Sequence, residues 1–417
     1  MSRFCEAPGC ARHHAGRAAE IFADELARFA ARDRDARVAE IGARLAAPLT
    51  VAVRGRRRVG VSTVAAALAG TGLEIADTCD VAVLVVAEVL KPEDEALLAE
   101  LTGAGRPAIV VLNKADLAGS GPKGPIAVAH HRAGRLQELA GVPVVPMVAL
   151  LSRVVLPDRL VDALSLLAAD PAPLNSADAF VTDPHRVAPD VRAELLERLD
   201  RFGVAHAMLS LSRGVSAERL PELLRRLSEV EQVVAAIDTA AASVRYRRVR
   251  RALAELRAVG GRAVEHFLAA DDTVIAVMSA AVDVVQAEGL TVDAGADRAA
   301  HLCRARHWRR YRDGPVNALH RSCGDDIVRG SLRLLGVADK GNDRGGCGPG
   351  RGRDGCGGGG RRRGGGDRSR PELTGRGDTR CGAGGGPVAG RVDERDGRAA
   401  GTDAARHFCG VHRTGGG

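Results

Sequence analysis

Apolar and polar positions follow three different patterns along the chain, and each pattern predicts a different kind of structure. In the first, from about Gly16 to Ala47, apolar residues recur every three or four positions within a stretch rich in alanine, arginine and glutamate. That spacing places the apolar side chains on one side of a helix. We therefore expect one or two amphipathic helices, which lead directly into the first strand.

Between Leu49 and Asp170 the pattern changes to short apolar runs separated by amphipathic stretches. Strands that are apolar on both faces are typical of parallel sheets with helices packed on each side. The runs predict strands at residues 49–53, 81–86, 108–112 and 142–148, with helices at 63–69, 93–102 and 126–140. This region is therefore expected to be an α/β domain with a parallel sheet.

After Asp170 the strand signals stop, and helical patterns follow one another. The stripe of apolar residues between Val274 and Val285 could dip into a membrane, but its helical spacing and acidic flanks favour the core of a helix bundle. We predict an all-α helical domain, with Ser216 as the N-cap of its second helix. Its helices are expected at residues 191–202, 217–242, 246–268, 274–288, 297–312 and 325–335.

Beyond Gly336 the chain consists largely of glycine, arginine and aspartate, which cannot bury enough apolar surface to fold. The expected organisation is therefore an N-terminal helical segment (1–47), a sheet domain (48–170), a helical domain (171–337) and a disordered Gly/Arg-rich tail (338–417).

Most of the formal net charge of +8 lies in this predicted tail. Residues 341–417 contain 15 Arg against 9 Asp and Glu, so the rest of the 417-residue chain is nearly neutral. Nucleic acid is therefore not the expected partner. The sequence has no apolar leader and no run of 18 apolar residues, which predicts a cytoplasmic protein with reduced thiols.

The nine cysteines contain one pattern that is reminiscent of a metal site. Cys5 and Cys10 precede His13 and His14, but zinc knuckles usually place ligands two to four residues apart and occur in pairs. A terminus without zinc is therefore favoured over a zinc site. The other cysteines have irregular spacing, and we interpret them as incidental thiols or small buried side chains.

The first chemical motif lies between the first predicted strand and the helix after it. The segment from Gly55 to Thr63 matches the phosphate-binding pattern GxxxxGK[ST], except that Val61 replaces the lysine. The missing ammonium would contribute about 1.5 to 3 kcal/mol through charge-assisted bonds to the phosphates, so nucleotide affinity should fall by roughly tens to hundreds of fold. One of three neighbouring arginines, Arg56, Arg57 or Arg58, could partly compensate.

The second motif is Asn113-Lys114-Ala115-Asp116, directly after the apolar run that ends at Leu112. It matches the NKxD pattern of guanine-nucleotide-binding proteins, in which the aspartate accepts hydrogen bonds from the guanine N1 and N2 groups. The chain has only four lysines, and Lys114 is at the position where the pattern requires one. In open α/β sheets, ligands bind at the carboxyl ends of strands, which is where this motif is expected.

With these two motifs in that order, residues 49–117 resemble a P-loop GTPase of the Era and dynamin-like branch. The flanking helices resemble the helical bundle or stalk of bacterial dynamin-like proteins. The resemblance implies a P-loop-type sheet, GTP or GDP as ligand, and magnesium on Ser62. It also implies that the amide of Ala149 meets guanine O6. The implied nucleotide-binding residues are Gly55, Arg58, Gly60, Ser62, Thr63, Asn113, Lys114, Asp116 and Ala149.

The chain departs from that family on the phosphate side. Only about 17 residues separate Thr63 from the strand at Val81, too few for the family's switch loop and DxxG turn. The segment from Asp77 to Asp80 is either a remnant of that turn or a simple loop entering the strand, and the second interpretation is favoured. Without a switch aspartate or a residue that positions water, hydrolysis should be slow or absent, and we assign no catalytic residue.

Two arginine runs, at residues 245–251 and 304–312, contain both tyrosines and the only tryptophan. They could contact phosphate groups of an anionic membrane or of nucleic acid, but helix faces paired with acidic residues of the bundle are favoured. Two hypotheses for function follow from the sequence. The first is a weak guanine-nucleotide-binding protein with little hydrolysis. The second is a pseudo-GTPase scaffold that binds a protein partner through its helical domain.

Overall fold

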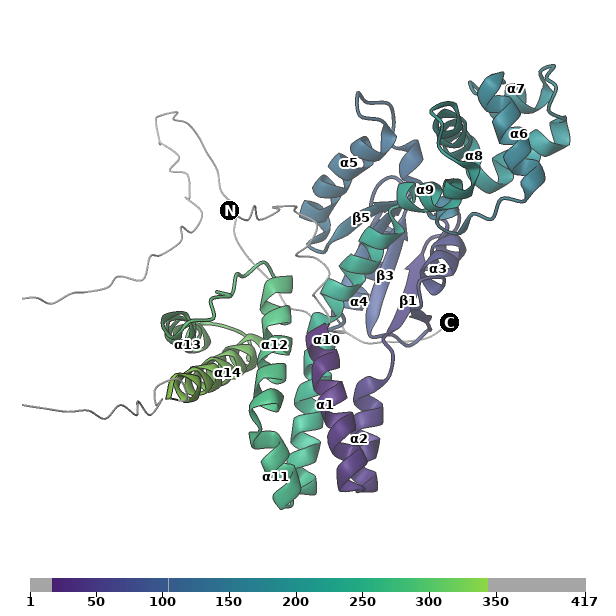
Figure 1. Ribbon diagram of the computed structural model, residues 1–417. Coiled ribbons are helices and arrows are strands. Elements are labelled where there is room, and N and C mark those ends of the chain that lie inside the picture. Colours follow the sequence, from purple (N-terminus) through teal and green to yellow (C-terminus); the bar gives the residue numbers. More distant parts are fainter. Residues whose placement is uncertain (1–16, 104, 344–417) are drawn as a thin grey trace, which may run out of the picture. The chain divides into compact units, whose positions relative to one another are not determined.

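A computed structural model describes residues 17–103 and 105–343 (Figure 1). Its centre is a parallel five-stranded sheet with the strand order β2-β1-β3-β4-β5. The strands are β1 (Thr50–Gly55), β2 (Glu74–Ile75), β3 (Val81–Val86), β4 (Ala108–Asn113) and β5 (Val144–Met147). The predicted α/β parallel sheet is confirmed, and its four apolar strands lie within about two residues of their expected bounds. The two-residue strand β2 was not predicted.

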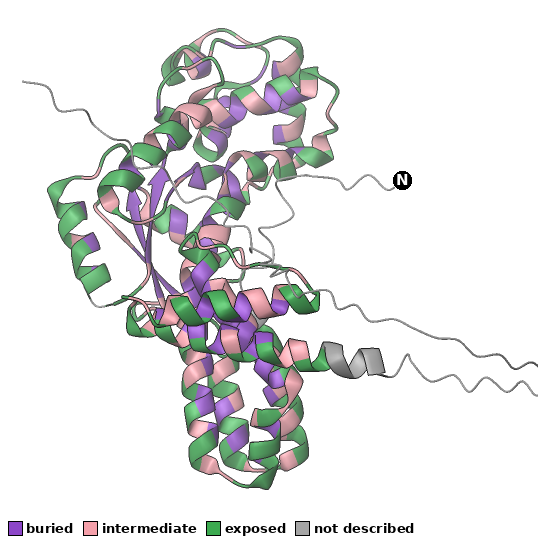
Figure 2. Cartoon of the chain, turned by 90° about the vertical axis from the view of Figure 1, so that its left-hand side faces the viewer, coloured by how far each residue is buried: buried purple, intermediate pink, exposed green. Residues whose placement is uncertain are grey.

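Both faces of the sheet are covered by helices, which explains why its strands are apolar on both sides. One face packs against α3 (Val61–Ala69) and the first half of α10 (Val230–Val259). The other face packs against α4 (Pro92–Gly103) and α5 (Pro125–Ala140). All residues of β3 and β4 are buried, as the colours of the strands in Figure 2 show.

Helix α10 belongs to two hydrophobic cores. Its residues Val230, Val233 and Ile237 pack against the sheet, whereas residues from Ala242 to Leu256 pack in the core of the helical bundle. The sequence pattern predicted a break near residues 243–245, but α10 continues through it. The break lies instead at Ser228 and Glu229, inside the helix expected at 217–242.

The helical bundle is built from both ends of the described chain. Its core joins α1 (Arg17–Asp33) and α2 (Ala36–Ala46) to the second half of α10 and to the helices that follow it. The apolar stripe on α12 is buried in this core, as expected. The later helices are α11 (Arg262–Ala269), α12 (Asp271–Ala287), α13 (Arg298–Arg312) and α14 (Ala318–Asp343).

A third group of helices lies in the sequence between β5 and α10, the helix that returns to cover the sheet. These helices are α6 (Asp158–Ala169), α7 (Ala177–Thr182), α8 (Pro189–Ser212) and α9 (Leu220–Leu227). Their core includes Ala115, Ala118 and Leu151, which belong to loops at the carboxyl edge of the sheet. The core also crosses residue 170, because Leu164 and Leu167 share it with α8.

No helix among the described residues is long and apolar enough to cross a membrane. The cysteine and histidine pattern at Cys5 to His14, where a terminus without zinc was favoured, and nearly all of the predicted tail lie outside the described residues. Of the three described cysteines, Cys323 is buried, while Cys79 and Cys303 are partly exposed.

Candidate functional site

The carboxyl edge of the sheet brings the two sequence motifs together. The phosphate-type loop follows β1, Lys114 and Asp116 follow β4, and the short 3-10 helix η3 (Ala149–Arg153) follows β5. Because all the strands are parallel, these three segments meet at the same edge of the sheet.

Asn113, the last residue of β4, joins the three segments. Its side-chain Nδ2 donates to the carbonyl of Val59 in the first loop at 2.9 Å, and its Oδ1 accepts from the amide of Ala149 at 3.1 Å. The Asn113 side chain is 4 % exposed, so both bonds are shielded from water. Through these two bonds the Asn113 side chain holds the loop after β1 and the loop after β5 together.

The two glycines of the first loop are required by packing. A Cβ on Gly55 would lie 2.6 Å from the carbonyl oxygen of Val85, and a Cβ on Gly60 would overlap the Asn113 amide nitrogen. Gly60 also has a φ of 93°, which side-chain-bearing residues rarely adopt. These glycines therefore shape the loop whether or not a phosphate binds there.

Lys114 and Asp116, the other residues of the second motif, lie in the turn after β4. Lys114 is exposed, with a left-handed backbone (φ 58°). Asp116 is half-buried, and among the described residues only its own backbone amide donates to its carboxylate. Burial raises the pKa of Asp116, and the charge of Asp200 on α8 raises that pKa further. The carboxylate therefore lacks a donor from another residue.

The loop that carries Ala149 is fixed on several sides. The Ser152 hydroxyl donates to the carbonyl of Ala149 at 2.8 Å, and the amide of Val148 donates to the carbonyl of Ser228 at 3.0 Å. Arg153 donates to the carbonyl of Ala66 on α3. The amide of Ala149, expected to meet guanine O6, donates to Asn113 in this structure. Sequence reasoning missed Ser228, because its place beside β5 depends on the fold of the helices between them.

The phosphate side has a different character. Val61 is partly buried against the sheet core, while the hydroxyl-bearing residues Ser62 and Thr63 are exposed on the first turn of α3. Arg56 does not reach toward a phosphate, because its Nε donates to both carboxylate oxygens of the buried Asp94, at 2.9 and 3.0 Å. In this structure the Arg56 guanidinium is therefore held by Asp94, and its role as a substitute for the missing lysine stays a prediction.

Arg57 and Arg58 remain as cations of this loop. Both are exposed, and Arg58 has a left-handed backbone with a φ of 71°. In the part of the chain that the structure describes, neither side chain has an acidic partner.

The segment from Asp77 to Asp80 behaves as a loop that enters a strand. Asp77 pairs with Arg54 at 3.0 Å and is 94 % exposed. Asp80 accepts from the amide and hydroxyl of Thr50 and pairs with Arg248 of α10 at 2.7 Å, at the amino edge of the sheet. These contacts favour the simpler of the two interpretations of this segment.

Magnesium would have few protein ligands at this edge. Among the described residues, no group of three or more His, Cys, Asp or Glu side chains could hold a metal ion. The residues present fit a magnesium ion only if it is held mainly by nucleotide phosphates, with the Ser62 hydroxyl as a protein ligand.

Strained backbone concentrates around these loops. Five described non-glycine residues have a left-handed φ: Arg34, Arg58, Lys114, Asp200 and Glu229. Arg58 and Lys114 lie in the two motifs, Asp200 acts on Asp116, and Glu229 follows Ser228. Such residues cost about 1 to 3 kcal/mol each and cluster at functional sites.

The arginine runs separate into a structural run and a partly free one. In the first, Tyr246 is buried and donates to Asp326 at 2.7 Å, and four of the five arginines pair with acidic residues. The paired arginines are Arg245, Arg248, Arg250 and Arg251. In the second, Trp308 is buried, whereas Arg306, Arg309 and Arg310 are exposed and have no acidic partner among the described residues. The aromatic rings therefore serve the bundle core.

Comparison of the chain with protein-family models, with curated proteins and with solved structures finds no match. The fold is a parallel five-stranded α/β domain compatible with a P-loop-like fold, joined to an all-helical region. Any functional conclusion consequently depends on the residues at the carboxyl edge of the sheet.

Proposed function

We propose that this chain binds guanine nucleotides at the carboxyl edge of its sheet and hydrolyses them slowly or not at all. The observation that carries the proposal is the Asn113 side chain, which holds the first loop and the Ala149 loop together beside Asp116. This bridge places a phosphate-type loop, a half-buried carboxylate and a third loop around one edge of the sheet.

The half-buried Asp116 supports guanine as the base. A carboxylate accepts with both oxygens, and guanine offers neighbouring N1 and N2 donors. Hydrogen bonds to a charged group contribute about 1.5 to 3 kcal/mol each, which would offset the cost of burying this carboxylate. The stem of the exposed Lys114 and the partly exposed Leu150 supply apolar surface for the base.

The phosphates would be held more weakly. The amides at the start of α3 and the hydroxyls of Ser62 and Thr63 suit an anion, with Arg57 and Arg58 as the nearby cations. The lysine of the pattern is absent, and Arg56 is held by Asp94. GTP and GDP are therefore expected to bind with similar, low affinity. Magnesium would contribute through the phosphates and Ser62.

The direct test is titration with fluorescent GDP and magnesium. Wild-type protein should bind GDP, Asp116→Ala should not, and Val61→Lys should tighten binding by roughly tenfold or more, since it restores a charge-assisted contact. Asp116→Asn supplies a matched control, because its amide donor suits the C2 carbonyl of xanthine and should shift preference to xanthosine diphosphate. If Val61→Lys produces no Asp116-dependent binding, the nucleotide proposal is wrong.

Slow hydrolysis is tested separately by phosphate release from GTP at saturating nucleotide. The wild-type protein should release phosphate slowly or at the background rate of the non-binding variant Asp116→Ala, because no residue is assigned to orient the attacking water. Asp116-dependent turnover at rates typical of active GTPases would contradict this part of the proposal.

A pseudo-GTPase scaffold is the second candidate, and one observation favours it. The Ala149 amide and both glycines already have roles within the protein, so the edge of the sheet is fully built without a nucleotide. In that case the helical bundle, formed by both ends of the described chain, would bind a protein partner. The GDP titration decides between the two candidates.

A further inference from the structure

The loop that carries Ala149 is held from outside by the connection between α9 and α10, which we call the elbow (Arg225 to Glu231). The carbonyl of Ser228 accepts the amide of Val148, the residue directly before the loop. Ser228 is wholly buried. The elbow therefore contacts the proposed base-contacting loop at the residue next to Ala149, whose own amide donates to Asn113.

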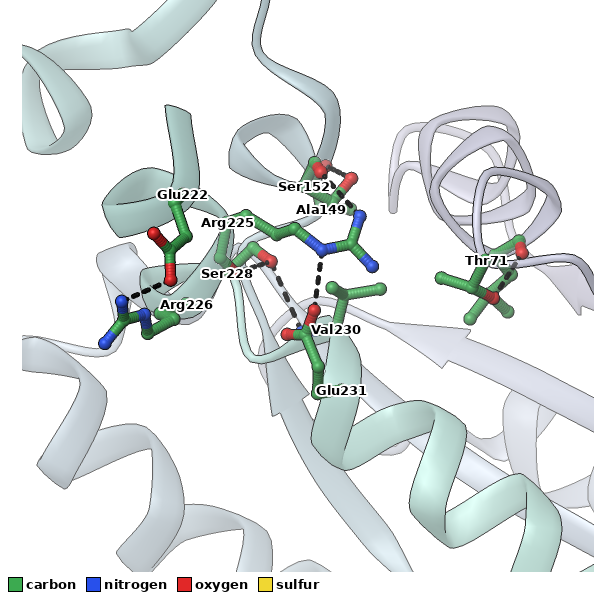
Figure 3. Close-up of polar contacts among 10 residues, drawn as sticks. Thr71, Ala149, Ser152, Glu222, Arg225, Arg226, Ser228, Val230 and Glu231 are labelled. Atoms are coloured by element: carbon green, nitrogen blue, oxygen red, sulfur yellow. Dashed lines mark hydrogen bonds and ion pairs between the residues drawn. The ribbon is translucent and has the colours of Figure 1, made fainter. Parts of the chain in front are cut away.

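Arg225 makes the second contact between the elbow and the loop. Its Nε donates to the Glu231 carboxylate at 2.6 Å, and its Nη1 points to the carbonyl of Ser152 at 3.4 Å (Figure 3). The guanidinium is rigid and planar, so a fixed Nε also fixes the direction of Nη1. Glu231 thus aims Arg225 at the loop.

Ser152 transmits this contact to Ala149. Its hydroxyl donates to the Ala149 carbonyl, and its own carbonyl, near the end of the short helix η3, faces Arg225. Carbonyls at helix ends lack partners within the helix and are commonly satisfied by side-chain donors. Removing the guanidinium would loosen the short helix that begins at Ala149.

The elbow is itself well fixed. The Ser228 hydroxyl donates to the Arg225 carbonyl at 2.5 Å and accepts from the Val230 amide at 3.3 Å. Glu229 has a left-handed backbone with a φ of 61°, and its carboxylate lies 3.7 Å from His130 on α5. The elbow is therefore a rigid support for the loop.

We infer that Arg225, aimed by Glu231, is a positioning residue for the loop that meets the guanine base, so that the helical region helps to set nucleotide affinity. This inference rests on the proposed function. It adds a residue from outside both sequence motifs to the proposed site.

The neighbouring Arg226 offers a matched control. It points away from the loop, and among the described residues it pairs only with Glu222, at 2.5 Å, one turn back on α9 (Figure 3). Arg226→Gln removes the same charge from the same helix without touching Ser152. Any effect of lost charge alone should appear equally in both variants.

The experiment compares Arg225→Gln, Arg225→Lys, Glu231→Gln and Arg226→Gln in the full chain. We expect Arg225→Gln to weaken GDP binding roughly three- to fivefold, the effect of one partly exposed charged contact. ADP binding should change little, so the preference for GDP over ADP should fall. Lysine should restore part of the loss because it keeps the charge but not the rigid geometry. Arg226→Gln should match the wild-type protein.

Hydrogen exchange of the amides at residues 148–152 supplies an independent readout without nucleotide. Exchange should speed up in Arg225→Gln and Glu231→Gln, but not in Arg226→Gln. If the wild-type chain binds GDP and Arg225→Gln leaves both affinity and exchange unchanged, this inference is overturned alone. If the wild-type chain does not bind GDP at all, the proposed function fails as well.

Discussion

The two halves of the carboxyl edge are built from different kinds of contact. On the base side, a buried asparagine joins three segments through neutral hydrogen bonds, and the elbow supports the same loop from outside. On the phosphate side, Arg56 pairs with Asp94, while Ser62 and Thr63 are exposed. The base side is thus organised by the fold, whereas the phosphate side offers mainly exposed groups.

This difference separates contacts that stabilise the fold from groups that would act only on a ligand. The contacts of Asn113 stabilise the protein itself, so losing them would cost stability even if no nucleotide ever bound. An exposed lysine in place of Val61 would bring no such benefit to the folded chain. We therefore expect mutations on the base side to affect folding and mutations on the phosphate side to affect affinity.

The largest effect should come from Asn113→Ala. The change leaves the Val59 carbonyl and the Ala149 amide without partners in a buried place, which should lower the free energy of unfolding by about 3 kcal/mol. Urea denaturation measures the loss. Asn175→Ala removes an exposed asparagine and is the control. Equal midpoints for the two variants would mean that Asn113 does not hold the loops together.

Arg56→Ala should have the next largest effect. It leaves the wholly buried Asp94 with only the Lys91 amide as a donor, and a buried carboxylate without its cation destabilises the fold. We expect the melting temperature to fall by about 5 °C. Arg57→Ala, which removes an exposed neighbour, should leave melting unchanged. If Arg56→Ala weakens GDP binding and leaves the melting temperature unchanged, Arg56 contacts the phosphates instead of stabilising the fold.

A smaller effect of opposite sign is expected from Asp116→Asn in the absence of nucleotide. Because burial and Asp200 raise the pKa of Asp116, its ionised form destabilises the folded chain at neutral pH. Asparagine removes that charge and should stabilise by no more than about 1 kcal/mol after solvent screening.

The gain from Asp116→Asn should shrink as the pH falls through the raised pKa, because the folded chain then protonates Asp116 while the unfolded chain still carries it ionised, and it should be gone once both states are protonated. Thermal melts of the wild-type protein and of Asp116→Asn between pH 7 and pH 3 measure this difference in stability. A gain that does not depend on pH would show that charge is not its source. Asp200→Asn should reduce the same gain, because it removes one cause of the raised pKa.

The smallest change in stability is expected from Arg58→Gly. Glycine removes the strain of the left-handed backbone, which raises the free energy of unfolding by about 1 to 2 kcal/mol. Its larger loss of chain entropy on folding lowers the free energy of unfolding by about 0.5 to 1 kcal/mol. GDP affinity should nevertheless fall roughly two- to fivefold, as expected for one exposed cation. An unchanged GDP affinity would remove Arg58 from the proposed site.

Local patterns predicted most of the fold. The strands β1, β3, β4 and β5 each contain a short apolar run, and such runs can be recognised without knowledge of distant contacts. Strand β2 has only two residues, too few to produce a pattern. The break at Ser228 was missed because Ser228 is fixed by a contact with Val148, 80 positions earlier in the chain.

The candidate site divides in the same way. Asn113 and Asp116 could be predicted because the NKxD motif is contiguous and follows a strand. Arg225 and Asp200 could not, because their places depend on how the helices between β5 and α10 fold back. Arg56 and Asp94 are 38 positions apart, so the sequence alone did not reveal their pairing. That pairing occupies an arginine that was considered as a phosphate contact.

The continuity of α10 also determines how this protein can be divided. A fragment ending at residue 170 would keep every strand but lose Val233 and Ile237, which cover one face of the sheet. The remaining fragment would lose the sheet on which the first half of α10 lies. We therefore expect neither piece to fold alone, and the sheet and the bundle to melt in a single cooperative transition.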